Sequence, residues 1–357
     1  MLRALAFSLI TMGLVAAAPK GPQLTGALAK PGALDAATLQ GLPKYRRLVK
    51  IATPDGQYRC SMEVEGYALR DVLDRRTLKK QEDGFNRPLD TFVTVKGRNG
   101  EQALFSHGET FLAGDEGPLL VEKARLILPH HHDPLKAGKN DPTVLLNVAG
   151  RQGINLASCI GCHEGPKPPA LSFPKGWLVV SPQDAFGGRF VEEVQEIALR
   201  QVGTPVKDTR ATAKNAFVEA PSVVGPDGKA FTLGTERFQQ LPRSAMKDAT
   251  FGLGRGFHGL NTSEGASLDA LLRPLLPAGT DPRKTYVVVT AEDGYRAVYS
   301  GSEVFLAAPE KGVLLVERKN GAALGKGSGR YTTLSRTDFY IDRDVRMVKE
   351  IRLELMR

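Results

Sequence analysis

Cysteine, tryptophan and long apolar runs are all scarce in this sequence of 357 residues. It contains three cysteines and one tryptophan, and aromatic residues make up 7% of the chain. An exported domain stapled by disulfides would carry a larger and even number of cysteines, so we expect packed cores to hold this chain together. Beyond the N-terminus, no apolar stretch reaches the roughly 20 residues that a spanning helix needs. We therefore expect no membrane span in the processed protein.

The N-terminus has the pattern of a secretory signal. Arg3 precedes an uncharged apolar run from Ala4 to Val15, and small residues follow at positions 16–18. A basic start, a short apolar core and small residues in this order are typical of a cleaved export signal, with an uncleaved anchor as the alternative. We expect residues 1–17 to be removed and the mature protein to be periplasmic or secreted.

The chain carries a surplus of positive charge, with 48 Lys and Arg, 39 Asp and Glu, and a formal net charge of +9. Such a surplus suits an anionic membrane surface, an acidic protein or a nucleic acid. Because the chain is expected to be exported, we predict no nucleic acid partner. The basic residues are also scattered, with short clusters such as Arg75-Arg76 and Lys79-Lys80, which are typical of a solvated surface.

Five short segments recur in the same order in the two halves of the chain. This agreement predicts a tandem duplication, with domains at 20–203 and 204–357. Each copy has a glycine turn from a strand into a helix, and a hairpin turned near Asn99-Gly100 or Asp293-Gly294. The matching segments are Leu42-Pro43 and Leu241-Pro242, 66–69 and 265–268, 92–95 and 286–289, 119–122 and 314–317, and 194–197 and 348–351.

The two copies differ by an insertion in the first. Glu122 and Glu196 are 74 positions apart, whereas the matching Glu317 and Glu350 are 33 positions apart. The excess falls at about 129–175 and is rich in proline and glycine. It contains three consecutive histidines, His130, His131 and His132, and the sequence Cys159-Ile160-Gly161-Cys162-His163.

The Cys-x-x-Cys-His motif predicts a covalently attached c-type haem. In c-type cytochromes the two thiols bond to the haem vinyl groups and the adjacent histidine binds the iron. Cys159 and Cys162 would form the thioethers, and His163 would be the proximal ligand. The predicted export agrees with this chemistry, because haem is attached to such proteins in the compartment that the signal implies. A redox dithiol or disulfide and a zinc site completed by histidines remain the alternatives.

A six-coordinate haem would need a second axial ligand. His130, His131 and His132 are the nearest candidates in the sequence, because they share the insertion with the motif. An open sixth position would instead admit a small ligand. More distant candidates, for which a core or surface role is the simpler interpretation, are His107, His258, Met62 and Met246.

The repeated segments resemble the molybdopterin-binding domain of the sulfite oxidase family. The resemblance rests on the Gly-x-x-Leu-x-x-x-Leu turn into a helix, the hairpin at 293–300 followed by Glu303, and the closing Val-x-x-Ile strand. It implies an α+β fold, with two tandem mixed α/β-sheet domains. It also implies a molybdenum-binding cysteine upstream of the turn. The second copy has no cysteine and the first offers only Cys60 within a predicted strand, so we expect a structural Cys60 and no molybdopterin.

We therefore expect an exported mono-haem electron-transfer protein on a scaffold that lacks the molybdenum cysteine. Its expected partner is another exported redox protein, and the positive charge of this chain would help to attract an acidic one. No catalytic residue is assigned. The alternatives are a molybdopterin-dependent oxidoreductase with Cys60 as ligand, or its haem subunit, and a non-redox module that binds a ligand or a partner. In the second copy, His258, Arg255 and Asn261 precede the glycine turn and either line a pocket or belong to an ordinary loop.

Overall fold

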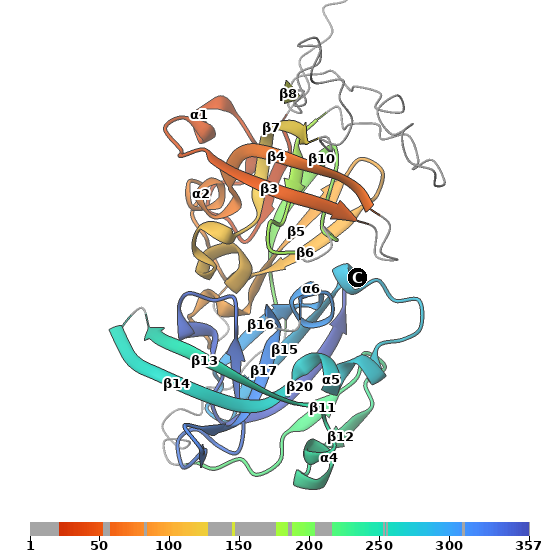
Figure 1. Ribbon diagram of the computed structural model, residues 1–357. Helices are drawn as coiled ribbons and strands as arrows, with labels where there is room; N and C mark the ends of the chain where they lie inside the picture. The colour runs from red at the N-terminus through yellow and green to blue at the C-terminus, as the bar shows by residue number, and fades with distance from the viewer. Residues whose placement is uncertain are drawn as a thin grey trace, which may run out of the picture.

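The fold is mixed α/β, rich in β-sheet and with few, short helices (Figure 1). Its N-terminal half lies above its C-terminal half in this view. Among the described residues, no helix is long and apolar enough to cross a membrane. The computed structural model describes residues 21–52, 58–81, 84–127, 145–146, 176–184, 188–203, 216–252, 254, 256–308 and 311–356.

The first sheet of the N-terminal half has five strands in the order β2-β1-β10-β5-β6. β1 runs parallel to β10, and the other neighbours are antiparallel. The predicted hairpin at Asn99-Gly100 is confirmed, because β5 pairs with β6 and Gly100 has the φ of 77° that a tight turn favours. The strands are β1 (Gln23–Gly26), β2 (Gly32–Ala33), β5 (Thr91–Gly97), β6 (Gln102–Ser106) and β10 (Val194–Gln201).

The second sheet of this half has the order β3-β4-β7-β8, and β9 also pairs with β7. β4 continues directly into helix α2, as the glycine turn predicted. The strands are β3 (Tyr45–Ala52), β4 (Tyr58–Ala68), β7 (Leu119–Ile127), β8 (Leu145–Leu146) and β9 (Leu178–Val180). The helices and helical turns are α1 (Ala36–Leu39), α2 (Leu69–Asp74), η1 (Pro88–Asp90), η2 (Gly108–Leu112) and η3 (Gly114–Glu116).

The C-terminal half has the same two strand orders, β12-β11-β20-β15-β16 and β13-β14-β17-β18 with β19 on β17. Its strands are β11 (Ser222–Val224), β12 (Ala230–Thr232), β13 (Arg243–Gly252), β14 (Gly256–Ser267), β15 (Thr285–Ala291), β16 (Arg296–Ser300), β17 (Val313–Lys319), β18 (Ala322–Ala323), β19 (Thr332–Ser335) and β20 (Val348–Leu355). Its helices and helical turns are α4 (Thr235–Gln239), α5 (Leu268–Leu272), α6 (Gly301–Phe305), η5 (Arg273–Leu275), η6 (Pro282–Lys284) and η8 (Ile341–Arg343).

The strand registers allow the two halves to be compared residue by residue. Gly66 of β4 lies opposite Val121 of β7, and Gly265 of β14 lies opposite Val316 of β17, each beside a register shift. A Cβ at these glycines would lie 2.2 and 2.0 Å from a backbone oxygen of the facing strand. Only glycine fits such a close approach, so Gly66 and Gly265 are equivalent positions.

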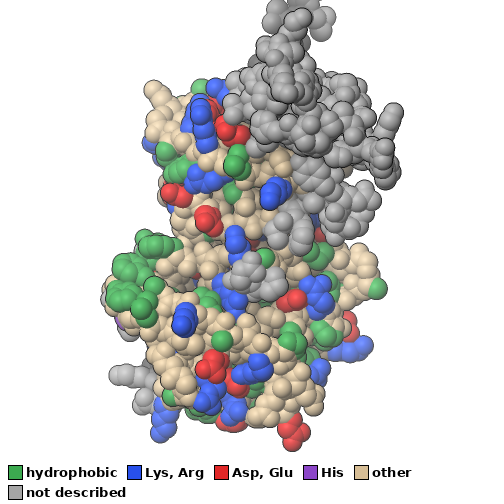
Figure 2. Space-filling model, viewed as in Figure 1, with side chains coloured by type: hydrophobic (Ala, Val, Ile, Leu, Met, Phe, Trp, Pro, Cys, Tyr) green, Lys and Arg blue, Asp and Glu red, His purple; other side chains and the backbone are tan. Residues whose placement is uncertain are grey.

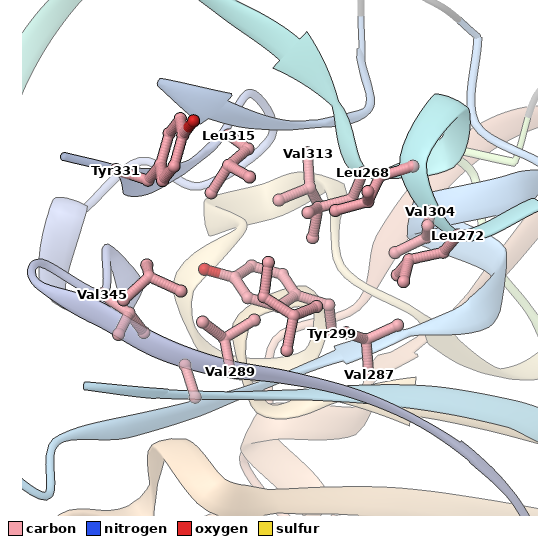
Figure 3. Packing of buried hydrophobic residues seen from close by; sticks show 14 of the residues in the cluster. Leu268, Leu272, Val287, Val289, Tyr299, Val304, Val313, Leu315, Tyr331 and Val345 are labelled. Atoms are coloured by element: carbon pink, nitrogen blue, oxygen red, sulfur yellow. The ribbon is translucent and has the colours of Figure 1, made fainter. Parts of the chain in front are cut away.

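Each half packs an apolar core between its two sheets. In the C-terminal half, Tyr299 of β16 points into this core between Val287, Val289 and Val313 (Figure 3). Another cluster contains residues from both halves and therefore joins them. Its buried members are Phe92, Leu104, Val202, Val288 and Val298.

The predicted insertion begins and ends on neighbouring strands. β7 ends at Ile127, and β9 pairs with β7 through Leu119 and Val180. In the C-terminal half, β17 and β19 pair in the same way, but residues 320–331 suffice to connect them. Apart from the short strand β8, residues 128–175 lie outside the described residues.

Candidate functional site

The residues predicted to hold haem lie outside the described part of the chain. They are Cys159, Cys162, His163, His130, His131 and His132. Their mutual geometry is therefore not part of the site described below, and haem attachment stays a prediction.

Two of the more distant candidates for the second axial ligand, His107 and Met62, are buried. His107 is buried, its Nδ1 lies 3.1 Å from the Thr91 hydroxyl, and its ring stacks on Phe111. Burial, with the charge of Arg343, lowers the pKa of His107 to about 3, so the ring is neutral. Met62 is fully buried in an apolar cluster. Both residues therefore have core roles.

The described residues do not match the thiolate site of a molybdopterin enzyme. The C-terminal half contains no cysteine. In the N-terminal half, Cys60 lies within β4 opposite Ile51 of β3, and its side chain is outside the described residues. No cysteine lines the hollows of the C-terminal half described below, so these hollows do not supply the thiolate that this cofactor requires.

Three buried arginines connect the halves: Arg296 binds Asp90 at 2.5 Å, and Arg343 and Arg189 form a matched pair of clusters. Arg343 contacts Glu303 and Asp338 of its own half at 2.6 Å each, and its side chain is fully buried. It also donates to the hydroxyl of Ser106 in the N-terminal half at 2.7 Å. The guanidinium stacks over the ring of Tyr299, which closes it off from water.

Arg189 forms the equivalent set of contacts in the opposite direction. It pairs with Glu109 and Asp184 of the N-terminal half at 2.5 Å each. It also donates to the hydroxyl of Ser300 in the C-terminal half at 3.3 Å. Both arginines therefore complete their hydrogen bonding across the junction between the halves.

The two glutamates of this network close equivalent turns. Glu109 and Glu303 each accept a hydrogen bond from the backbone N–H three residues earlier, at Ser106 and Ser300. Burial raises the pKa of Glu109. For Glu303, burial acts in the same direction, but the charge and hydrogen bonds of Arg343 have the larger effect. The pKa of Glu303 therefore lies below its usual range.

An open cleft of about 990 Å³ lies between the halves. The rings of Phe92 and Tyr286 stack in it, with centroids 4.9 Å apart. Charged residues around the cleft pair with one another, as in the contacts of Arg352 with Glu350 and of Lys349 with Glu292. The cleft therefore shows no clear preference for a charged ligand.

Another face of the C-terminal half favours ligand binding more than the cleft does. In the N-terminal half, one face of β3, β4, β7 and β9 forms an apolar cluster that Phe190 completes. The same face of the C-terminal half is polar at seven positions, whereas Leu314, Val316 and Leu334 remain apolar and buried on it. Through the registers, Val49, Ile51, Met62, Val64, Ala124, Leu178 and Phe190 correspond to Asp248, Thr250, Asn261, Ser263, Lys319, Thr332 and Asp344.

This polar face lines two adjoining hollows that share Ile341, Asp344 and Arg346. The inner hollow measures about 200 Å³ and the outer one about 410 Å³. The polar residues of the inner hollow include Asp248, Thr250, Ser263, Lys319 and Thr332, and those of the outer hollow include Arg87, His258, Asp293 and Tyr295. Of the two alternatives for these residues, His258 lines the outer hollow, Asn261 lies beside the inner hollow, and Arg255 is outside the described residues.

The charges in these hollows are incompletely matched. Asp248 accepts hydrogen bonds from Thr250 at 2.5 Å and Ser263 at 3.4 Å. Burial raises the pKa of Asp344 well above its usual range, and the nearby Asp338 and Asp248 add to the rise. Lys319 and Arg346 have no ion-pair partner within the described ranges.

Apolar side chains gather at the end of the β13–β14 hairpin, next to the outer hollow (Figure 2). Phe257 is 60% exposed and Phe339 is 62% exposed. The Phe251 ring packs against Phe339 and Tyr340. Because Gly252 and Ile341 line the outer hollow, these rings stand beside its mouth.

The paired arginines were not predicted from the sequence. An available signal was the recurring Asp-x-x-x-x-Arg spacing, at Asp184 and Arg189 and again at Asp338 and Arg343. The polar face was not predicted either, because alternating polar residues on β13 look like a solvated strand until the partner strands are known.

No protein family model matches this chain, and no curated protein matches it in sequence. One solved structure that it resembles is the sulfane dehydrogenase SoxCD from Paracoccus pantotrophus, with 15% sequence identity and a TM-score of 0.30. The alignment covers 64% of this chain and 53% of that one, so the chain spans about half the length of that structure.

Proposed function

We propose that this protein is an exported mono-haem c-type electron carrier, built on two sulfite-oxidase-like domains that arose by duplication. The Cys159-Ile160-Gly161-Cys162-His163 sequence carries this proposal, because its thiol and imidazole donors match covalent haem attachment. The identical strand orders of the two halves support the duplication.

The position of the motif in the chain supports the same function. The segment that contains it connects β7 to β9, two strands that pair with each other, so its two ends lie side by side on one sheet. Haem bound there would supply a one-electron iron couple. Cys159 and Cys162 would anchor it, His163 would be the proximal ligand, and His130, His131 or His132 would be the distal ligand. Another exported redox protein would be the partner.

Haem attachment is tested by producing the chain with a cytochrome c maturation system. We expect a haemochrome spectrum, and a mass equal to the processed polypeptide plus one haem. Cys159→Ala and Cys162→Ala should each lose a thioether link, whereas the matched control Cys60→Ala should keep both. A colourless protein with the mass of the bare polypeptide would refute the proposal.

The distal ligand is tested by replacing each histidine of the triplet with alanine. Loss of the distal imidazole should convert a six-coordinate iron spectrum to a five-coordinate one in a single variant. An unchanged spectrum in all three variants would exclude the triplet as the source of that ligand.

A further inference from the structure

We propose that the polar face of the C-terminal half binds a small zwitterion that carries an ammonium group and a carboxylate, such as an amino acid. This site is separate from the haem segment and does not depend on the proposed electron transfer. Two observations support it: the difference between equivalent residues of the two halves, and the charges that face the two hollows.

The equivalent face of the N-terminal half shows what a purely structural role requires. There the layer is filled by apolar side chains, and Val64, Met62 and Ala124 are at most 1% exposed. Such a layer stabilises the sheet without any polar group. The C-terminal half places Ser263, Asn261 and Lys319 at these positions and leaves open hollows in front of them. Ser263 and Asn261 offset the cost of burial through hydrogen bonds to Asp248 and Thr250, but Lys319 has no ion pair among the described residues, so stability does not explain its charge at this position.

A row of three side chains crosses the sheet at this face. Ser263 of β14 pairs with Lys319 of β17, and its hydroxyl contacts Asp248 of β13. Residues opposite each other in antiparallel strands point to the same side. Asp248 and Lys319 therefore flank Ser263 with opposite charges, separated by two strand spacings, or about 10 Å.

The carboxyl groups at this face lack a cation and the basic groups lack an anion, and a zwitterion would supply both. Asp344 faces the hollows beside Asp248, while the nearest buried cation, Arg343, is already engaged by Glu303 and Asp338. An ammonium group placed between Asp248 and Asp344 would relieve the repulsion between these carboxyl groups. A carboxylate would in turn find Lys319 and Arg346, which have no ion pair among the residues described.

The mouth of the outer hollow suits the remainder of such a ligand. Phe251, Phe339 and Tyr340 provide an apolar surface beside it, where an apolar side chain could pack. The charged groups of the ligand would thus lie within the hollows, whose linings mix polar and apolar residues, and its apolar side chain would reach these rings outside the mouth.

The site is tested by calorimetric titration of the purified mature protein with glycine, leucine and phenylalanine. Propionate and butylamine, each with one charged group, serve as comparison probes. We expect at least one amino acid to bind, and both single-charge probes to bind about tenfold more weakly or worse. Absence of binding by all three amino acids, or equally tight binding of either single-charge probe, would overturn the proposal.

Variants locate the binding. Asp248→Val and Lys319→Ala introduce the residues found at the equivalent positions of the N-terminal half, and each should weaken binding by about tenfold. Lys247→Ala changes an exposed position of the same strand and should leave binding unaltered. Thermal unfolding confirms that each variant is folded. If Asp248→Val does not fold, Lys319→Ala by itself is enough to test the site. Unchanged binding in a folded Lys319→Ala variant would show that this face is not the site.

Discussion

Arg343 of the C-terminal half donates a hydrogen bond to the hydroxyl of Ser106 in the N-terminal half, at a distance of 2.7 Å. The reverse contact, from Arg189 to Ser300, is 3.3 Å long. Each arginine also neutralises a glutamate and an aspartate of its own half. The two ionic clusters are therefore complete only when the halves are together, and they couple the folding of one half to that of the other.

Replacing Arg343 should destabilise the whole chain. Arg343→Ala leaves Glu303 and Asp338 buried without their cation, and we expect the free energy of unfolding to fall by about 3–5 kcal/mol. Chemical denaturation measures this loss. The control Arg318→Ala removes a half-exposed pair with Glu264 and should cost at most about 1 kcal/mol. Similar losses in the two variants would contradict a central role for the network.

Gly108 should tolerate alanine only when Arg343 is absent. A Cβ at Gly108 would lie 2.1 Å from the Arg343 guanidinium carbon, so Gly108→Ala should cost about 1–3 kcal/mol by displacing it. In the Arg343→Ala background the same change should cost little, because the obstructing group is gone. A double-mutant cycle measured by denaturation tests this coupling. Gly203→Ala, with open space around the new methyl group, is the control, and additive effects would refute the expectation.

His107 should make the protein less stable in mild acid. Its pKa is about 3 in the folded protein and 6.5 in an ordinary environment, because burial disfavours the charged ring. The unfolded chain therefore binds a proton that the folded chain does not. The stability contributed by a neutral His107 is complete above pH 6.5 and is lost as the pH falls toward 3, by up to about 1.4 kcal/mol per unit.

The matching variant is His107→Gln. The difference in unfolding free energy between wild type and variant should shrink as the pH is lowered from 7 to 4. Glu109, whose pKa burial raises, acts in the opposite direction, but it is present in both proteins and cancels in the comparison. A difference that is independent of pH would contradict the neutral, buried ring.

The equivalent positions Val64 and Ser263 should respond differently to an exchange of side chains. Val64→Ser places a hydroxyl in a fully buried apolar cluster and should cost about 1–3 kcal/mol. Ser263→Val removes a hydroxyl from the polar hollow and should change the stability by less than about 1 kcal/mol. Thermal and chemical unfolding measure both. Equal losses would show that the polar face is a structural requirement.

Local chemistry made several elements predictable from the sequence. The hairpin turns at Gly100 and Gly294 and the turns from strand to helix after Gly66 and Gly265 are confirmed, because glycine permits backbone geometry that other residues resist. The sequence also supplies the donor set of Cys159, Cys162 and His163. Their attachment to haem stays a prediction, since these residues lie outside the described ranges.

The sequence alone determined where strands turn, where helices start and which thiols stand next to a histidine, since each depends on neighbours along the chain. Only the tertiary structure decided that Arg189 and Arg343 cross between the halves, and that Asp248, Ser263 and Lys319 share one face. Those relationships depend on strand register and on contacts between distant segments. A shift of one residue in register would turn every one of these side chains to the opposite face.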